Sequence, residues 1–168
     1  MTSFVTDLDL QTPLEPREAF YGGRTNAIRL YHQTVDDEEI HYDDYTSLYL
    51  WVNKYGKYPT GHPTILYHPG TTDLSPYFGL AKSTVLPPTD LFHPVLPYRH
   101  DQKLTFPLCR TCVHDHLTTP CQHTDDERVL TGTWCTPELE EAVRRGYTIV
   151  QIHEIWHFPT SKTGLFAD

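Results

Sequence analysis

The chain has 168 residues, which fits one domain or one piece of a larger protein. Its 22 acidic and 13 basic residues give a net charge of −9, which argues against tight binding to nucleic acid through surface charge alone, because Lys and Arg contacts to phosphate dominate that affinity. No apolar run reaches the roughly 18 residues that cross a bilayer and no secretory leader opens the chain, so we expect a soluble intracellular protein without membrane contact, in the nucleus, the cytoplasm or a viral factory.

The first part of the chain predicts an extended arm and a hairpin. Residues 1–16 are polar and interrupted by prolines, which indicates an entry arm. The stretches Asn26–Thr34 and Glu39–Tyr45 alternate in polarity around the acidic turn "VDDEE", a pattern typical of a β-hairpin. The alternation places Asp44 on the same face as Ile40, where an unpaired charge is unfavourable.

The middle of the chain is rich in proline and predicts few regular elements. "SLYLWVNKYG" indicates a short helix or turn that ends near Gly56. Residues 57–99 predict a long irregular region, followed by a hairpin around "RHDQK".

The last third predicts a strand–helix–strand unit. "LTGTW" indicates a short strand, and "TPELEEAVRRG" indicates a helix with Thr136 as N-cap and Gly146 just past its end. "TIVQIHEIWHF" predicts a strand in which Glu154 needs a partner if buried and His153 lies on a hydrogen-bonded or solvated face. The residues expected on the buried face of this strand are Val150, Ile152, Trp156 and Phe158. Together these elements predict an α+β fold.

Residues 109–123 contain a candidate zinc knuckle. Cys109 and Cys112 are two residues apart, and Cys121 and His123 return eight residues later, a spacing that can close a tetrahedral site. His114 and His116 are rival fourth ligands, and the alternative interpretation is a polar loop without metal. If zinc binds, we expect a structural role. Cys135 lies at a strand end, where a packed thiol is expected.

The stretch "DDYTSLYLWVNKYG" contains a second candidate metal site. Asp44 at the end of the predicted strand, followed by a turn with exposed amides and the hydroxyl of Ser47, is an arrangement that can hold Mg²⁺ beside a triphosphate. The alternative from spacing alone is a strand end at the surface.

Three motifs in this order resemble family B DNA polymerases. "DYTSLYL" is similar to motif A of that family, "REAFYGGRTNA" to its Tyr-x-Gly-Gly element, and "GTWCTPELEEAVRRGYTIVQIHEIWHF" to the strand–helix–strand after motif A in polymerases of Polinton (Maverick) transposons and related organellar and viral enzymes. The resemblance covers nearly all of residues 17–168. It implies that residues 17–66 form the start of a polymerase palm, with motif A on the hairpin. It also implies that residues 67–168 form an inserted subdomain that contains the zinc knuckle.

The resemblance also implies roles for single residues. Asp44 is expected to be one of two palm aspartates that bind the catalytic Mg²⁺ ions. Ser47 and the amide of Leu48 are expected to face the incoming nucleotide, and Tyr49 to stack under its sugar and exclude a 2′-hydroxyl. The residues expected to meet the DNA template are Phe20, Gly22 and Gly23.

Departures from the family pattern limit what these residues do alone. Leu50 replaces the family proline, and Phe20 replaces the first tyrosine of the Tyr-x-Gly-Gly element. The second metal aspartate and the Lys-rich nucleotide-binding helix of the family have no counterpart here. We therefore expect a segment of a protein-primed DNA polymerase, which is a nucleotidyltransferase. The full enzyme would use two Mg²⁺ ions, template-primer DNA, deoxynucleotides and a terminal protein primer. We expect the isolated chain to be inactive. The alternative is a transposon-derived, zinc-stabilised binding module without catalysis.

Overall fold

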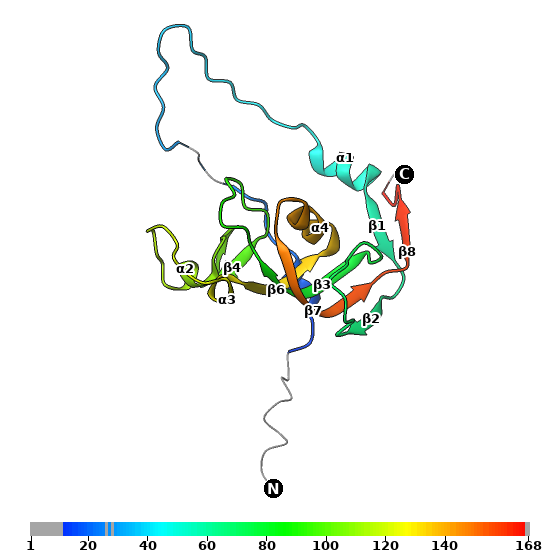
Figure 1. The fold of residues 1–168 in the computed structure, drawn as a ribbon. Helices are drawn as coiled ribbons and strands as arrows, with labels where there is room; N and C mark the ends of the chain where they lie inside the picture. Colours follow the sequence, from blue (N-terminus) through cyan, green and yellow to red (C-terminus); the bar gives the residue numbers. More distant parts are fainter. Residues whose placement is uncertain (1–11, 26, 28, 167–168) are drawn as a thin grey trace. The chain divides into compact units, whose positions relative to one another are not determined.

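A computed structural model describes residues 12–25, 27 and 29–166 (Figure 1). Its largest element is a four-stranded antiparallel sheet with strand order β2-β7-β3-β6, flanked in sequence by short helices and hairpins. The strands are β1 (Lys57–Thr60), β2 (Thr64–Tyr67), β3 (Gly79–Leu86), β4 (Tyr98–His100), β5 (Lys103–Thr105), β6 (Leu130–Cys135), β7 (Thr148–His157) and β8 (Thr160–Thr163). The helices are a 3₁₀ turn (Pro16–Ala19), α1 (Leu48–Tyr55), α2 (Arg110–His114), α3 (Asp125–Arg128) and α4 (Thr136–Arg144). The α+β class predicted from the sequence is confirmed.

The main core lies between the sheet and α4. Leu139 and Ala142 of α4 are fully buried against Ala81 of β3 and Trp134 of β6, and Figure 1 shows α4 beside these strands. The Trp134 indole also donates to the Pro97 carbonyl at 2.8 Å, which satisfies its only polar group. A smaller cluster of Leu14, Ala19 and Leu80 lies apart from this core. The predicted unit β6–α4–β7 is confirmed.

The face that β7 buries differs from the prediction. Ile149, Ile152 and Ile155 are buried, whereas Val150 is 53% exposed. The pairing of β7 with β3 shifts register twice, and each shift inserts one extra residue into β7. Every such bulge moves the following side chains to the other face, so strict alternation fails along this strand and the buried isoleucines recur every third position.

Helix α4 begins one position earlier than predicted. Cys135, not Thr136, is the N-cap, and its amide donates to Glu138 at 3.2 Å. Gly146 has φ +91° just past the C-cap, as its place in the sequence predicted.

The hairpin predicted around "RHDQK" is confirmed as β4–β5. Asp101 and Gln102 connect the two strands with φ of +48° and +63°. Two consecutive left-handed residues form the type I′ turn whose twist matches an antiparallel pair. This turn brings His100 and Asp101 to the tip of the hairpin.

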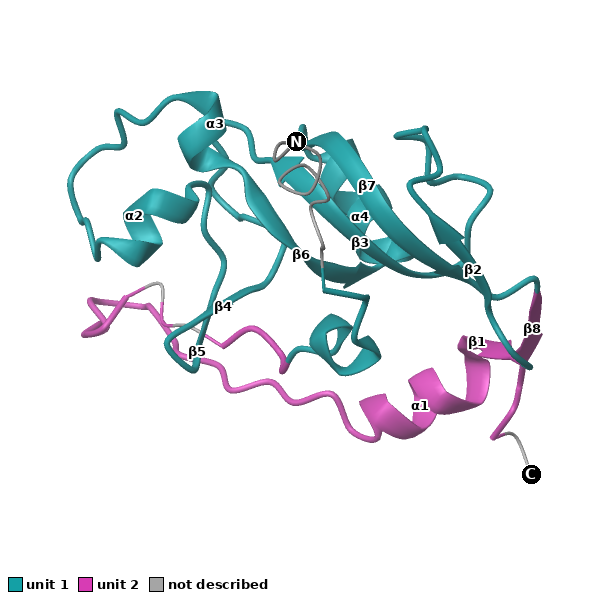
Figure 2. Ribbon diagram, turned by 90° about the horizontal axis from the view of Figure 1, so that it is seen from below, with its two compact units in different colours: residues 1–21, 61–159 teal, residues 22–60, 160–168 magenta. Residues whose placement is uncertain are grey.

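The chain divides into two compact units (Figure 2). Unit 1 contains the described residues up to Tyr21 and Gly61–Pro159, and so holds the four-stranded sheet, α2, α3 and α4. Unit 2 contains Gly22–Thr60 and the described residues from Thr160 onward, and joins α1 to the two-stranded β1–β8 ribbon. The helix predicted before Gly56 is confirmed as α1.

The hairpin predicted from Asn26–Thr34 and Glu39–Tyr45 is absent from the described residues. Asn26 and Ile28 lie outside the described part, and residues 29–45 contain no strand. Ile40 is 71% and Tyr42 is 94% exposed. A two-stranded hairpin is at best marginally stable when neither face packs on anything, so the alternation of this segment is not enough to form it.

The prediction of irregular structure over residues 57–99 is also wrong, because β1, β2 and the central strand β3 lie there. The inward residues of β3 include Ala81, Ser83 and Val85, which are all fully buried. Small side chains give a weak hydrophobic signal, and the prolines lie outside β3 at Pro76, Pro87 and Pro88. No helix in the described part of the chain is long and apolar enough to cross a bilayer.

Candidate functional site

Three cysteines and one histidine from 109–123 meet at one point of unit 1. Cys109 is the N-cap of α2 and Cys112 lies within that helix, while Cys121 and His123 lie on the loop before α3. The Cys109 sulfur accepts the Cys112 amide at 3.4 Å. Because the Cys109 thiol caps α2, the sulfur atoms of Cys109 and Cys112 lie together and face Cys121 and His123.

The four ligand atoms have the spacing of a zinc tetrahedron. Nδ1 of His123 lies 3.5 Å from the Cys109 sulfur, 3.4 Å from that of Cys112 and 3.5 Å from that of Cys121. All four atoms lie within 4.8 Å of one another. Bond lengths of about 2.3 Å for Zn–S and about 2.0–2.1 Å for Zn–N give a sulfur–nitrogen edge of about 3.6 Å in a tetrahedron. The residues therefore fit a Cys₃His zinc site.

The thiols of this cluster differ in acidity. Desolvation, together with hydrogen bonds to the other two thiols, raises the pKa of Cys112 to about 12. Hydrogen bonding from the His123 amide lowers the pKa of Cys121 to about 7. Thiols this close oppose one another's ionisation, and a divalent cation between them would remove that repulsion.

The two rival fourth ligands have other contacts. Nε2 of His114 is hydrogen-bonded to the Tyr98 hydroxyl at 3.0 Å. Nε2 of His116 faces the Asp101 carboxylate at 3.9 Å. The structure thus places His123, and neither rival, with the three thiols.

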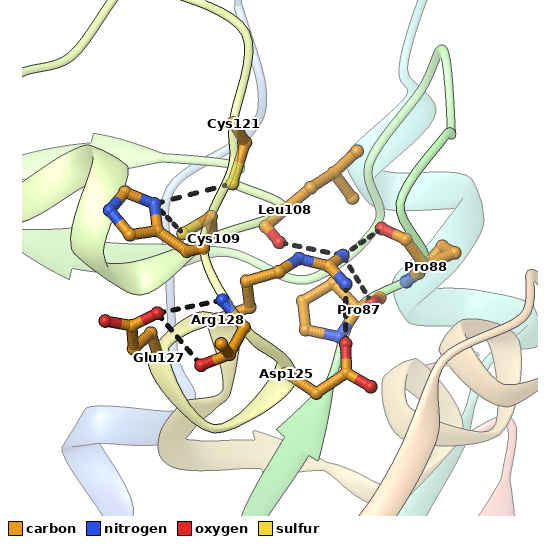
Figure 3. A network of polar contacts seen from close by, with 10 residues as sticks. Pro87, Pro88, Leu108, Cys109, Cys121, Asp125, Glu127 and Arg128 are labelled. Carbon is orange, nitrogen blue, oxygen red and sulfur yellow. Dashed lines mark hydrogen bonds and ion pairs between the residues drawn. The ribbon is translucent and has the colours of Figure 1, made fainter.

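A buried arginine fixes the position of the cysteine cluster relative to the sheet (Figure 3). Arg128 is 4% exposed and donates to the carbonyls of Pro87 at 2.8 Å, Pro88 at 2.7 Å and Leu108 at 3.4 Å. Pro87 directly follows β3, and Leu108 directly precedes Cys109. Asp125 pairs with the same guanidinium at 3.1 Å. One side chain therefore connects the end of the central strand to the first ligand of the cluster.

The motif around Asp44 lies at the surface of unit 2. Asp44 is exposed, and Ser47, with φ +60°, is the N-cap of α1. Leu48 is 47% and Tyr49 is 86% exposed at the first two positions of that helix. The motif thus ends at a helix N-terminus with accessible side chains. Among the described residues, Asp44 belongs to no group of three or more metal-ligating side chains.

The predicted DNA-contacting residues straddle the boundary between the two units. Phe20 is 63% exposed, and its carbonyl accepts from Arg99 at 3.4 Å. A Cβ added at Gly22 or Gly23 would meet open space, so neither position requires glycine within the described structure. Their approach to a template strand stays a prediction.

Sequence reasoning missed Tyr21, the second aromatic of "FYGG". Its hydroxyl donates to the Thr133 carbonyl at 3.3 Å, Arg99 lies 5.0 Å from its ring centroid, and burial raises its pKa to about 12. Tyr21 therefore packs against β6 within unit 1. The sequence contained a signal, because an aromatic beside two glycines is a natural packing residue.

The comparison with protein families decides what this arrangement belongs to. A family model described as DNA polymerase type B, organellar and viral, matches residues 11–168. The chain belongs to this polymerase family. No curated protein and no solved structure matches the chain. Members of the family are DNA-directed DNA polymerases, whose reaction requires a divalent metal, a DNA template-primer and nucleotides.

The described residues of this polymerase chain fit a two-metal site only in part. Two metal ions in such a site are usually clamped by carboxylates from separate segments. Asp44 is the carboxylate that the motif resemblance predicts as a ligand, and among the described residues it belongs to no group of metal-ligating side chains.

Proposed function

We propose that this chain carries the motif A segment of a protein-primed type B DNA polymerase, of the kind found in Polinton (Maverick) transposons. The reaction of the full site is template-directed transfer of a nucleotide to a primer. The main support is the position of "DYTSLY", which lies exposed at the start of a helix. The polymerase family model matches residues 11–168, which include this motif. The order of the three family motifs along the chain supports the same assignment.

The exposure of the motif supports the role that we propose for each residue. Asp44 is a Mg²⁺ ligand, and Ser47 holds the triphosphate at the N-terminus of α1, where backbone amides favour anions. The Leu48 amide, which here donates to the Tyr45 carbonyl at 3.3 Å, exchanges that contact for the triphosphate. Tyr49 stacks under the sugar of the nucleotide and excludes a 2′-hydroxyl by its bulk. Its 86% exposure leaves the ring free for that contact.

We further propose that the 168 residues alone do not extend a primer, since Asp44 has no carboxylate partner among the described residues. In the full enzyme, residues 67–168 form the insertion that meets DNA and the terminal protein primer, and Phe20, Gly22 and Gly23 meet the template.

Primer extension tests this function. The polypeptide made from the native transcript is assayed with primer–template, deoxynucleotides and Mg²⁺, as wild type and as Asp44→Asn. We expect Asp44→Asn to lower the rate by at least about a hundredfold, because loss of a metal ligand removes several kcal/mol of transition-state stabilisation.

Asp43→Asn is the matched control, since it removes a neighbouring exposed carboxylate and the same charge. We expect it to keep most of the activity. Equal losses in both variants would contradict the assignment of Asp44. Extension by the 168-residue chain at the rate of the full polypeptide would contradict the proposal that this segment is incomplete.

A second candidate function is a zinc-stabilised binding module without catalysis, and the Cys₃His geometry favours it. In either function we propose that Cys109, Cys112, Cys121 and His123 hold a structural Zn²⁺, because four protein ligands leave no open position for a substrate. Zinc would supply charge neutralisation for the thiolates and a cross-link between α2 and the loop before α3.

Metal analysis tests the zinc site. We expect one Zn²⁺ per chain that survives desalting, and we expect Cys112→Ser to remove it. Cys135→Ser is the matched control, because Cys135 lies outside the cluster. A chain without tightly bound zinc, or Cys135→Ser losing the metal as readily as Cys112→Ser, would contradict the site. A chain whose fold depends on this zinc but which lacks polymerase activity in its native form favours the binding module.

A further inference from the structure

A second group of metal-ligating side chains lies outside the Cys₃His cluster. His100 ends β4, Asp101 begins the turn to β5, and His116 follows α2. Nε2 of His100 lies 3.3 Å from Oδ2 of Asp101, and Nε2 of His116 lies 3.9 Å from the same oxygen. The three ligand atoms lie within 4.8 Å of one another. His100 and Asp101 are adjacent in the sequence, and the tertiary structure brings His116 to them.

The spacing is close to that of ligands on one cation. Zinc bonds of about 2.0–2.2 Å to nitrogen and oxygen give ligand edges of about 3.3–3.5 Å in a tetrahedron. The His100–Asp101 pair already has this separation. The side chains of His116 and Asp101 are 69% and 64% exposed, so rotation of either can close the remaining gap without disturbing the core.

The ring of His100 is held in place by its neighbours. His114 stacks on it with a centroid distance of 4.2 Å and an interplanar angle of 12°. His114 is in turn hydrogen-bonded through Nε2 to the Tyr98 hydroxyl at 3.0 Å. These contacts fix the orientation of the ring and leave Nε2 of His100 directed at Asp101.

His116 adopts a left-handed backbone conformation just after α2. The Leu117 amide donates to the Cys112 carbonyl and the His116 amide donates to the Val113 carbonyl, which is the hydrogen-bond pattern of a Schellman motif. His116 has φ +53° at the position after the helix where glycine is favoured. A histidine at such a position is a reason to look for a function of its side chain.

We infer that His100, Asp101 and His116 bind a second divalent transition-metal ion, which joins the tip of the β4–β5 hairpin to the loop between Cys112 and Cys121. Two imidazoles and a carboxylate suit Zn²⁺, Co²⁺ or Ni²⁺ better than Mg²⁺ or Ca²⁺, which prefer oxygen ligands. Three protein ligands leave a position open for water or an external donor. The competing interpretation is that the same contacts are only ion pairs between protonated histidines and Asp101.

Zinc titration of the full chain by equilibrium dialysis tests the inference. We expect two ions per wild-type chain, of which one exchanges readily and one does not. Asp101→Asn and His116→Gly should each lower the affinity for the exchangeable ion by at least about tenfold. The loss of a ligand costs more metal affinity than the loss of a contact that only orients a ligand. Both variants suit their backbone, because asparagine tolerates the left-handed turn and glycine is favoured after the helix.

Controls separate this site from other sources of weak binding. His93→Ala removes an exposed histidine elsewhere in unit 1 and should leave two ions bound. Cobalt substitution adds a second readout, because the second ion should absorb without further thiolate-to-cobalt charge transfer. A wild-type chain that binds a single ion overturns the inference. Two ions that persist in both Asp101→Asn and His116→Gly also overturn it, because the second ion then lies elsewhere.

Discussion

Glu154 illustrates how a single charged residue constrains this fold. It is 5% exposed in the central part of the sheet, and its carboxylate accepts from the Leu14 amide and the Trp156 indole, both at 2.7 Å. The sequence predicted that a buried Glu154 would need a partner. It could not identify Leu14, because that residue lies 140 positions away in the arm before the 3₁₀ turn. The buried charge therefore ties the start of the described chain to β7.

Replacing Glu154 with alanine should destabilise unit 1 by about 2 kcal/mol, because two donors lose their acceptor in a region with little water. The measurement is urea denaturation followed by circular dichroism. Glu140→Ala is the control, since Glu140 is exposed on α4 and its loss should change the free energy of unfolding by less than about 0.5 kcal/mol. Equal effects of the two substitutions would show that the Glu154 contacts contribute nothing.

The candidate metal ligands show which parts of a site are readable from sequence. Cys109, Cys112 and Cys121 lie within a short stretch, so their spacing was sufficient to predict a common site. The choice of His123 over its rivals depended on where α2 ends and which way its following loop turns. The pairing of His116 with Asp101 was not predictable, since it depends on the approach of a hairpin from another part of the chain.

At the scale of elements, β3 shows why a central strand escaped prediction. Its fully buried residues include the small Ala81 and Ser83, which permit close packing but weaken the hydrophobic pattern. It begins at Gly79, where φ is +152° and an added Cβ would overlap the Trp156 carbonyl of β7. The glycine that marks the strand start was read as part of an irregular region. Structurally it is what allows β7 to approach.

Alanine substitutions at two glycines should separate strain from steric overlap. Gly146→Ala should lower the free energy of unfolding by about 1 kcal/mol, because alanine is strained at a φ of +91°. The new methyl group would make only ordinary contacts with Pro88. Gly79→Ala should cost on the order of 3 kcal/mol or more, because backbone must move as well. Thermal or urea denaturation measures both. A Gly79→Ala variant as stable as Gly146→Ala would mean that β7 shifts freely at Trp156.

At the scale of the whole molecule, the two units differ in how much apolar surface they bury. Unit 1 contains both hydrophobic clusters of the described residues. Unit 2 contains α1, in which no residue is buried. The sequence predicted the elements of β6–α4–β7 because α4 carries clear start and end signals and β7 is a long apolar run, although the buried face of β7 was assigned wrongly. It failed on the hairpin of residues 26–45, because alternation predicts a strand without showing what that strand packs against.

Hydrogen–deuterium exchange should distinguish the predicted hairpin from the exposed segment that the structure describes. Residues 30–45 should exchange within seconds, since they have no strand hydrogen bonds, while amides of β3 and β7 should be protected by orders of magnitude more. The β4–β5 hairpin is an internal control, because it is a formed two-stranded element that is itself partly exposed to solvent. Protection of residues 30–45 equal to that of β4–β5 would show that the hairpin carrying Asp44 forms after all. Fast exchange would mean that Asp44 reaches a fixed position only when another surface packs against this segment, and the metal binding that we propose for Asp44 would then depend on that contact.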